Sequence, residues 1–121
     1  MTEIDSAMPK NFSIMQNCMA ILALINADGV TKEIYEQLRK DVNWERNHPE
    51  GGMFHVAAFR GDNETRVVDI WNSEQDWNNF VQTRLTPVLQ RMNIPAPAAE
   101  IFQIHNINVF PAAERYRVAQ A

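Results

Sequence analysis

The spacing of hydrophobic and polar residues along the chain predicts four strands and two helices. The apolar run at residues 19–25 is far shorter than the roughly 20 residues that a membrane-spanning helix needs, and it is typical of a strand buried on both faces, predicted over residues 18–26. Over residues 30–44 apolar side chains recur every four positions with charged ones between them, which indicates an amphipathic helix. Residues 52–59 and 66–71 are predicted to be the second and third strands.

A second helix is predicted to begin at Ser73, a residue type that often caps helices, and its apolar stripe continues as far as Met92. Pro87 lies inside this stripe and lacks the N–H that a helical hydrogen bond needs. We therefore expect a kink there, or a restart of the helix with Thr86 as the new N-cap. The fourth strand is predicted over residues 100–110, which are rich in Ile, Val and Phe.

The order strand, helix, strand, strand, helix, strand is typical of the ferredoxin-like βαββαβ arrangement, an α+β fold with an antiparallel sheet and helices on one face. We expect this domain over residues 18–110. An arm at residues 1–17, partly disordered or extending the first strand, precedes it, and a tail at 111–121 follows. The predicted strands are apolar on both faces, although the helices cover only one. We therefore expect a second copy of the chain to bury the other face, as a homodimer.

Two polar residues, His55 and Asp69, interrupt the second and third strands on either side of a short turn at residues 61–65. Side chains alternate along a strand, so a loop with an odd number of residues places both on one face, with His55 opposite either Asp69 or Trp71. An even loop would separate them. We favour the odd loop because it also places the apolar residues that alternate with the polar pair in these two strands on one common surface. A buried carboxylate needs a donor, and His55 is the nearest candidate.

This pair supports two interpretations. In the functional one, Asp69 orients the His55 imidazole as a general base, and Trp71 forms a flat wall for a planar ligand. In the structural one, the same hydrogen bond only fixes the register of the hairpin. Further candidates for ligand contact are a second histidine and several apolar side chains, although aromatic residues on helices usually belong to the core. They are His105, Phe59, Met53, Trp77 and Phe80.

His105 and Asn106 on the predicted fourth strand raise the question of a metal site, since two histidines and a carboxylate form a familiar iron site. In this topology the first strand separates the third from the fourth, so His105 lies two strand spacings, about 9.5 Å, from Asp69. Neither predicted helix contains a histidine that could serve as a haem ligand. We therefore expect no metal and no cofactor.

Composition narrows the partners and the compartment. The chain has 121 residues, and its 11 Lys and Arg against 15 Asp and Glu give a net charge of −4 with no basic cluster. We therefore expect neither nucleic acid nor an anionic membrane as a partner. Cys18 stands alone and residues 1–5 are acidic rather than basic, so a disulfide-linked or secreted protein is not indicated. The expected location is the cytoplasm.

Several short motifs together resemble the dimeric α/β-barrel superfamily. The resemblance extends over residues 18–110, and within the superfamily it is to an uncharacterised bacterial group related to antibiotic-biosynthesis-monooxygenase-like domains. The motifs are Pro-Glu-Gly at 49–51, His-Val-Ala at 55–57, Val-Val-Asp-Ile-Trp-Asn-Ser at 67–73, Arg-Leu-Thr-Pro at 84–87 and His-Asn at 105–106.

The resemblance implies two ferredoxin-like protomers that pack their sheets face to face. It also implies a wide range of functions, from cofactor-independent monooxygenases of aromatic polyketides and haem-degrading enzymes to lyases, isomerases and domains without known catalysis. The fold alone does not choose among them. We expect a small-molecule-binding protein with cofactor-free oxygenation or proton-transfer chemistry on a compact hydrophobic substrate. The alternative is a non-catalytic binding or assembly module in which the polar pair is structural.

Overall fold

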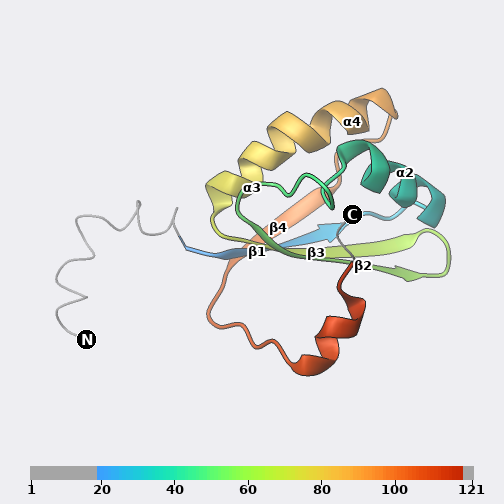
Figure 1. The fold of residues 1–121 in the computed structure, drawn as a ribbon. Helices are drawn as coiled ribbons and strands as arrows, with labels where there is room; N and C mark the ends of the chain where they lie inside the picture. Colours follow the sequence, from blue (N-terminus) through green and yellow to red (C-terminus); the bar gives the residue numbers. More distant parts are fainter. Residues whose placement is uncertain (1–18, 119–121) are drawn as a thin grey trace, which may run out of the picture.

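A computed structural model describes residues 19–118 and shows a four-stranded antiparallel sheet with helices on one face (Figure 1). The predicted arm at residues 1–17 lies outside the described residues. In chain order the elements are β1 (Ile21–Asn26), α2 (Lys32–Val42), β2 (Gly52–Arg60), β3 (Glu64–Trp71), α3 (Glu74–Phe80), a π-helical segment (Val81–Leu85), α4 (Thr86–Arg91), β4 (Ala98–Gln103) and a 3₁₀ helix (Pro111–Tyr116).

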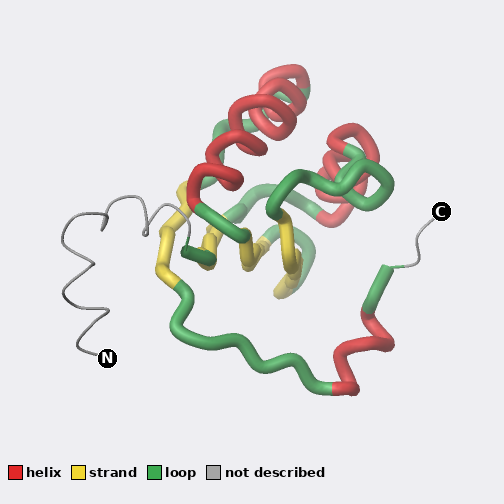
Figure 2. The backbone as a smooth tube through the Cα atoms, turned by 60° about the vertical axis from the view of Figure 1, so that its left-hand side comes forward, coloured by secondary structure: helices red, strands yellow, loops and turns green. Residues whose placement is uncertain are grey.

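The strand order β2-β3-β1-β4, with every neighbouring pair antiparallel, is the ferredoxin-like order. The α+β class and the placement of the α-helices on one face of the sheet are confirmed. Figure 2 shows these helices on one side of the strands and the segment after β4, with its 3₁₀ helix, on the other. No helix within residues 19–118 is both long enough and apolar enough to cross a membrane.

Helix α2 is shorter than the predicted span of residues 30–44. Polar contacts hold it at both ends. Thr31 caps its start, where the hydroxyl oxygen accepts a hydrogen bond from the Ile34 N–H at 3.1 Å. Asn43 ends it in a left-handed conformation with φ of 63°. Arg84 donates a hydrogen bond to the Val42 carbonyl at 2.9 Å, which ties the end of α2 to the π-helical segment.

The second helical region begins as predicted, and near its proline it shows an irregularity, which is a π-helical segment rather than a restart capped by Thr86. Ser73 caps α3 by accepting a hydrogen bond from the Asp76 N–H at 3.1 Å. The helix does not restart at Thr86, which is itself helical and donates its N–H to the Val81 carbonyl five residues earlier. Pro87 supplies no N–H, and a widened π turn just before it lets the chain continue without a break.

Strand β4 is shorter than the predicted span of residues 100–110. Its ladder with β1 runs to the pair Ile21 and Gln103, followed by a single hydrogen bond from the Ile104 N–H to the Ala20 carbonyl at 2.9 Å. A strand needs a partner for its backbone groups, so β4 ends where β1 begins. The chain then leaves the sheet and forms its 3₁₀ helix in the stretch predicted as a tail.

The apolar core lies between the sheet and the helices, and the opposite face of the sheet remains open. Ile21, Ala23 and Val67 are buried on the helix side, together with Trp71 and other side chains of that face. The pairing places Val56, Val68 and Leu24 in one row on the other face. There Val56 is 57% exposed and Phe102 is 51% exposed. The helices thus bury one face of a sheet that is apolar on both.

Candidate functional site

The β2-β3 hairpin brings His55 and Asp69 together. Its loop is shorter than the expected turn at residues 61–65 and comprises the three residues 61–63, so the odd count is confirmed. Gly61 permits the turn because its φ is 67°, a conformation that favours glycine. With this loop, His55 lies directly across from Asp69. Met53 forms a bulge at the far end of the hairpin and shifts the register there. Its neighbours Gly52 and Phe54 both pair with residues of β3, whereas Met53 does not.

Both oxygens of the Asp69 carboxylate accept hydrogen bonds. His55 Nδ1 lies 2.7 Å from Oδ1, and the Trp71 Nε1–H donates to Oδ2 at 3.3 Å. The Asp69 side chain is only 8% exposed, whereas the His55 side chain is 31% exposed. The arrangement therefore buries an acceptor group under two donors, and the far edge of the imidazole, at Nε2, points away from the carboxylate.

The Nε2 edge of the imidazole contacts Tyr35, which is not among the sequence-predicted site residues. The Tyr35 hydroxyl lies 2.7 Å from His55 Nε2, and burial raises the pKa of Tyr35 to about 12. Helix α2 carries Tyr35 on the same face as the buried residues Leu38 and Val42. A phenol within a buried helical stripe requires a polar partner, and this was the available signal in the sequence. Tyr35, His55 and Asp69 thus form one continuous chain of hydrogen bonds.

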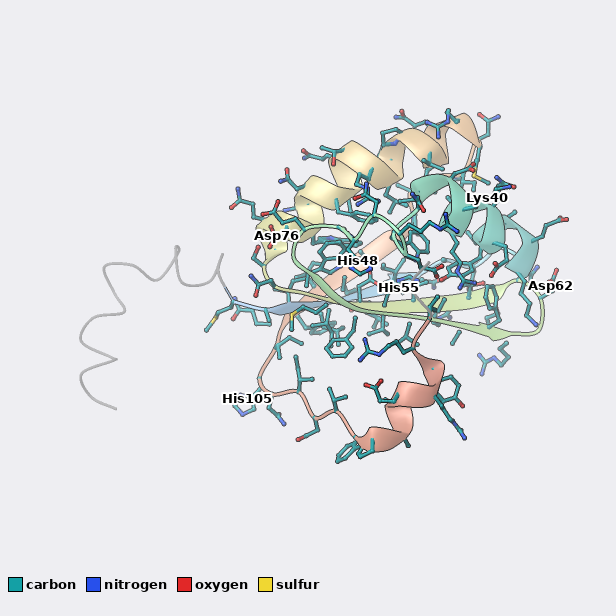
Figure 3. The ribbon with its side chains drawn as sticks, in the orientation of Figure 1. Lys40, His48, His55, Asp62, Asp76 and His105 are labelled. Atoms are coloured by element: carbon teal, nitrogen blue, oxygen red, sulfur yellow. The ribbon has the colours of Figure 1, made fainter. Side chains whose placement is uncertain are left out.

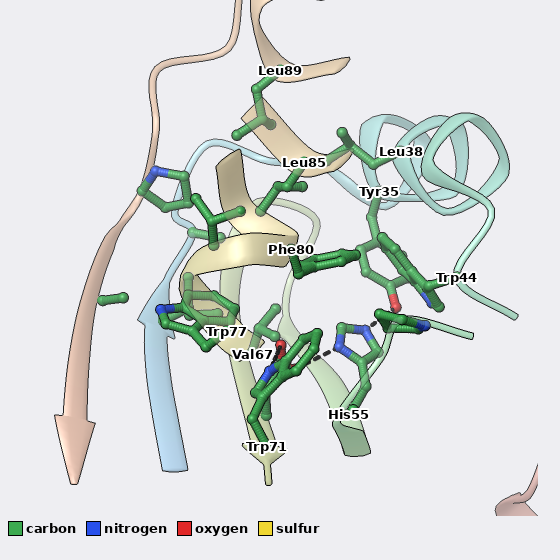
Figure 4. A pocket seen from close by; sticks show the side chains of 18 of the residues that line it. Tyr35, Leu38, Trp44, His55, Val67, Trp71, Trp77, Phe80, Leu85 and Leu89 are labelled. Carbon is green, nitrogen blue, oxygen red and sulfur yellow. Dashed lines mark hydrogen bonds and ion pairs between the residues drawn. The ribbon is translucent and has the colours of Figure 1, made fainter. Parts of the chain in front are cut away.

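These three residues line a cavity of about 300 Å³ between the sheet and the helices (Figure 4). The rest of its surface is mostly aromatic and aliphatic. The ring of Trp44 lies 5.0 Å from the His55 ring, between centroids, and the ring of Trp71 lies 5.0 Å from that of Phe80. Val67, Leu85 and Leu89 contribute aliphatic walls, among others. The cavity is therefore an apolar space with one polar corner, which Tyr35, His55 and Asp69 form.

The structure brings most of the sequence-predicted site residues to this cavity. Trp71, Trp77, Phe80 and Met53 line it together with the polar pair. Phe59 packs against the Tyr35 ring with 5.8 Å between centroids and supports the site from outside the lining. Phe59 lies on the same face of the sheet as His55 and Asp69, as alternation along the strands predicts.

His105 lies away from the site altogether, and its expected contact with the ligand is corrected. It is exposed on the segment that follows β4, on the side of the sheet away from His55 (Figure 3). The reason is that β4 ends at Gln103, so His105 is not held in the sheet. His48, in the loop between α2 and β2, lines the cavity instead. Within residues 19–118 no three His, Cys, Asp or Glu side chains gather as metal ligands.

Comparisons with known proteins bear on the fold. No protein-family model matches the sequence, and no curated protein sequence matches it significantly. A conserved protein from Methanosarcina mazei Go1 is similar in structure, with a TM-score of 0.51, 15% identity, and coverage of 74% of this chain and 97% of that one. SnoaB, a cofactor-independent oxygenase from Streptomyces nogalater crystallised as the mutant N63A, has a TM-score of 0.51, 12% identity, and coverage of 74% and 94%. At these identities the chain shares the α+β fold of both proteins.

The raised pKa of Tyr35 predicts a late step in an alkaline titration. Because burial raises the folded-state value to about 12 and an unfolded tyrosine ionises near pH ~10, this residue's contribution to folding stability is complete below about pH 10 and is lost as pH rises towards 12. Phenolate absorbance should show an ionisation near pH 12, and Tyr35→Phe should remove it. Tyr116→Phe, at a side chain that is 73% exposed, is the matched control and should retain it. A late step that survives Tyr35→Phe would contradict the assignment.

Proposed function

We propose that the protein binds a compact hydrophobic molecule in the cavity and abstracts a proton from it without a cofactor. The observation that carries the proposal is the Asp69-His55 contact of 2.7 Å, in which a nearly buried carboxylate holds an imidazole that lines a mostly apolar cavity. A carboxylate at one imidazole nitrogen fixes the tautomer and stabilises the imidazolium that forms on proton transfer. Apolar walls lower the local dielectric and strengthen these interactions.

The reaction that follows proton abstraction decides the enzyme class. The ligand becomes an anion that either reacts with oxygen or is protonated again elsewhere, which corresponds to an oxygenase or an isomerase. SnoaB, which is similar in fold, is a cofactor-independent oxygenase, so the first of these reactions is compatible with the fold, while the fold itself does not choose between the two. We also propose, on the motif resemblance, that the chain is a member of the dimeric α/β-barrel superfamily.

The open face of the sheet supports the proposal of a homodimer. Val56 and Phe102 are each more than half exposed on the face opposite the α-helices. Soluble monomers rarely expose a continuous apolar sheet face, and a second copy of the same face buries it symmetrically. We propose that two sheets pack against one another in this way.

One observation favours a non-catalytic alternative. Within residues 19–118 no buried side-chain nitrogen or oxygen lacks a hydrogen-bond partner, so the polar corner is satisfied without a ligand. In this alternative the Asp69-His55 bond holds the hairpin register and the cavity only binds. Binding without proton transfer is therefore the outcome that separates the two functions.

Hydrogen exchange of a carbon acid tests the catalytic proposal. 2-Tetralone is a compact, uncharged, bicyclic ketone, and its acidic C–H exchanges in deuterated water at a rate that NMR follows. The wild-type protein should accelerate this exchange, and His55→Gln should reduce the acceleration by about 100-fold because a positioned base is lost. His105→Gln makes the same change at an exposed site away from the cavity and should leave the rate unchanged.

The result that would overturn catalysis is equal exchange by wild type and His55→Gln, with both proteins folded and both binding the ketone. That result would establish the binding module instead. If the wild type neither binds the ketone nor speeds its exchange, then the ligand-binding proposal itself is wrong for this class of molecule.

Static light scattering tests the dimer. Val56→Lys places a charge in the proposed interface, so the wild type should have the mass of two chains and the variant the mass of one. Gln90→Lys adds the same charge on an exposed position of α4 and should remain dimeric. Wild-type protein with the mass of a single chain would show that the proposal is wrong.

A further inference from the structure

The positions of the protons in the polar corner follow from the hydrogen bonds. Asp69 accepts from the Trp71 Nε1–H through Oδ2, and its Oδ1 lies 2.7 Å from His55 Nδ1. An ionised carboxylate accepts but does not donate, so the hydrogen lies on Nδ1. In the neutral imidazole the other nitrogen, Nε2, then has no hydrogen and must accept one.

The Tyr35 hydroxyl is the donor that Nε2 requires. Its oxygen lies 2.7 Å from Nε2, so its hydrogen points at the imidazole. A phenolic oxygen that donates its hydrogen still has lone pairs that accept a hydrogen bond. The imidazole edge is thus covered by the phenol, and a ligand that enters the polar corner meets the Tyr35 oxygen before it meets Nε2.

The charges of the residues around the cavity indicate which kind of ligand it accepts. Among the described residues that line the cavity there is one carboxylate, Asp69, and there is neither a lysine nor an arginine. The two nearby arginines are engaged elsewhere. Arg84 donates to backbone carbonyls at the end of α2, and Arg39 pairs with Glu45 and Glu36. A carboxylate or phosphate on a ligand therefore meets a negative group in an apolar space that offers no lysine or arginine as a partner.

We infer that Tyr35 is the group that touches the ligand, and that the ligand is an uncharged apolar molecule with one acidic hydrogen directed at the phenolic oxygen. This inference rests on the proposed function and specifies its route and its ligand class. The ligand's O–H or C–H bond breaks and its proton moves to the Tyr35 oxygen, while the Tyr35 hydrogen moves to His55 Nε2. The ligand holds the electron pair as an anion, and the imidazolium lies beside the Asp69 carboxylate.

Three probes with one ring system test the ligand class by equilibrium dialysis near neutral pH. 2-Naphthol offers a donor, naphthalene offers none, and 2-naphthoate carries a negative charge. Wild type should bind naphthol about fivefold more tightly than naphthalene, which is the effect of one neutral hydrogen bond. It should bind naphthoate at least about tenfold more weakly than naphthol, because of repulsion by the Asp69 carboxylate.

Variants assign these preferences to residues. Tyr35→Phe should bring naphthol to the affinity of naphthalene and leave naphthalene itself unchanged. Tyr116→Phe, the same change at an exposed site, should preserve the preference. Asp69→Asn should weaken the discrimination against naphthoate. In the 2-tetralone assay, Tyr35→Phe should slow exchange by at least about tenfold, since the proton no longer has its first acceptor.

The outcomes separate this inference from the proposed function. If His55→Gln slows ketone exchange but Tyr35→Phe does not, the proton reaches His55 directly and the Tyr35 route is wrong while the function stands. If naphthoate binds as tightly as naphthol, the ligand class is wrong. If none of the three probes binds the wild type, then the cavity does not bind such rings and the proposed function fails with the inference.

Discussion

The burial of the Asp69 carboxylate is the constraint on which the site depends. A carboxylate that is 8% exposed and unpaired would cost several kcal/mol, so the fold must bring donors to it. His55 supplies one from the facing strand, at a position that this hairpin register provides, and Trp71 supplies the other from two residues further along β3 itself. An even loop would turn His55 to the open face of the sheet and leave the carboxylate with half of its partners. The length of the β2-β3 loop therefore determines whether His55 faces Asp69 in the cavity.

The same constraint reaches the helices through Tyr35. The capped helix α2 presents this phenol to the imidazole, and Arg84 fixes the end of α2 against the π-helical segment. The wide turn before Pro87 keeps α3 and α4 in one continuous path above the sheet. The helices thus enclose the apolar space, and the hairpin and α2 together form its single polar corner. Folding and the proposed proton transfer use the same hydrogen bonds.

Much of this arrangement follows from the sequence, and the remainder depends on tertiary contacts. Alternation along two strands and an odd loop were sufficient to predict that His55 and Asp69 share a face, because strand periodicity is local. Tyr35 was missed because helical periodicity gives its face but not the strand that it meets. His105 was misplaced because the end of β4 is set by where β1 begins, which lies far away in the sequence. The turn at Pro87 was anticipated as an irregularity, but its π geometry depends on packing.

Nitrogen NMR of His55 tests the central claim, that a buried Asp69 carboxylate sets the imidazole tautomer and directs Nε2 to Tyr35. The account predicts that the neutral imidazole carries its hydrogen on Nδ1, with Nε2 unprotonated and hydrogen-bonded to Tyr35. It also predicts that Tyr35→Phe alters the Nε2 signal and leaves the Nδ1 signal in place. A neutral imidazole with its hydrogen on Nε2 would contradict the account, because Asp69 would then lack its donor and the relay would have no acceptor.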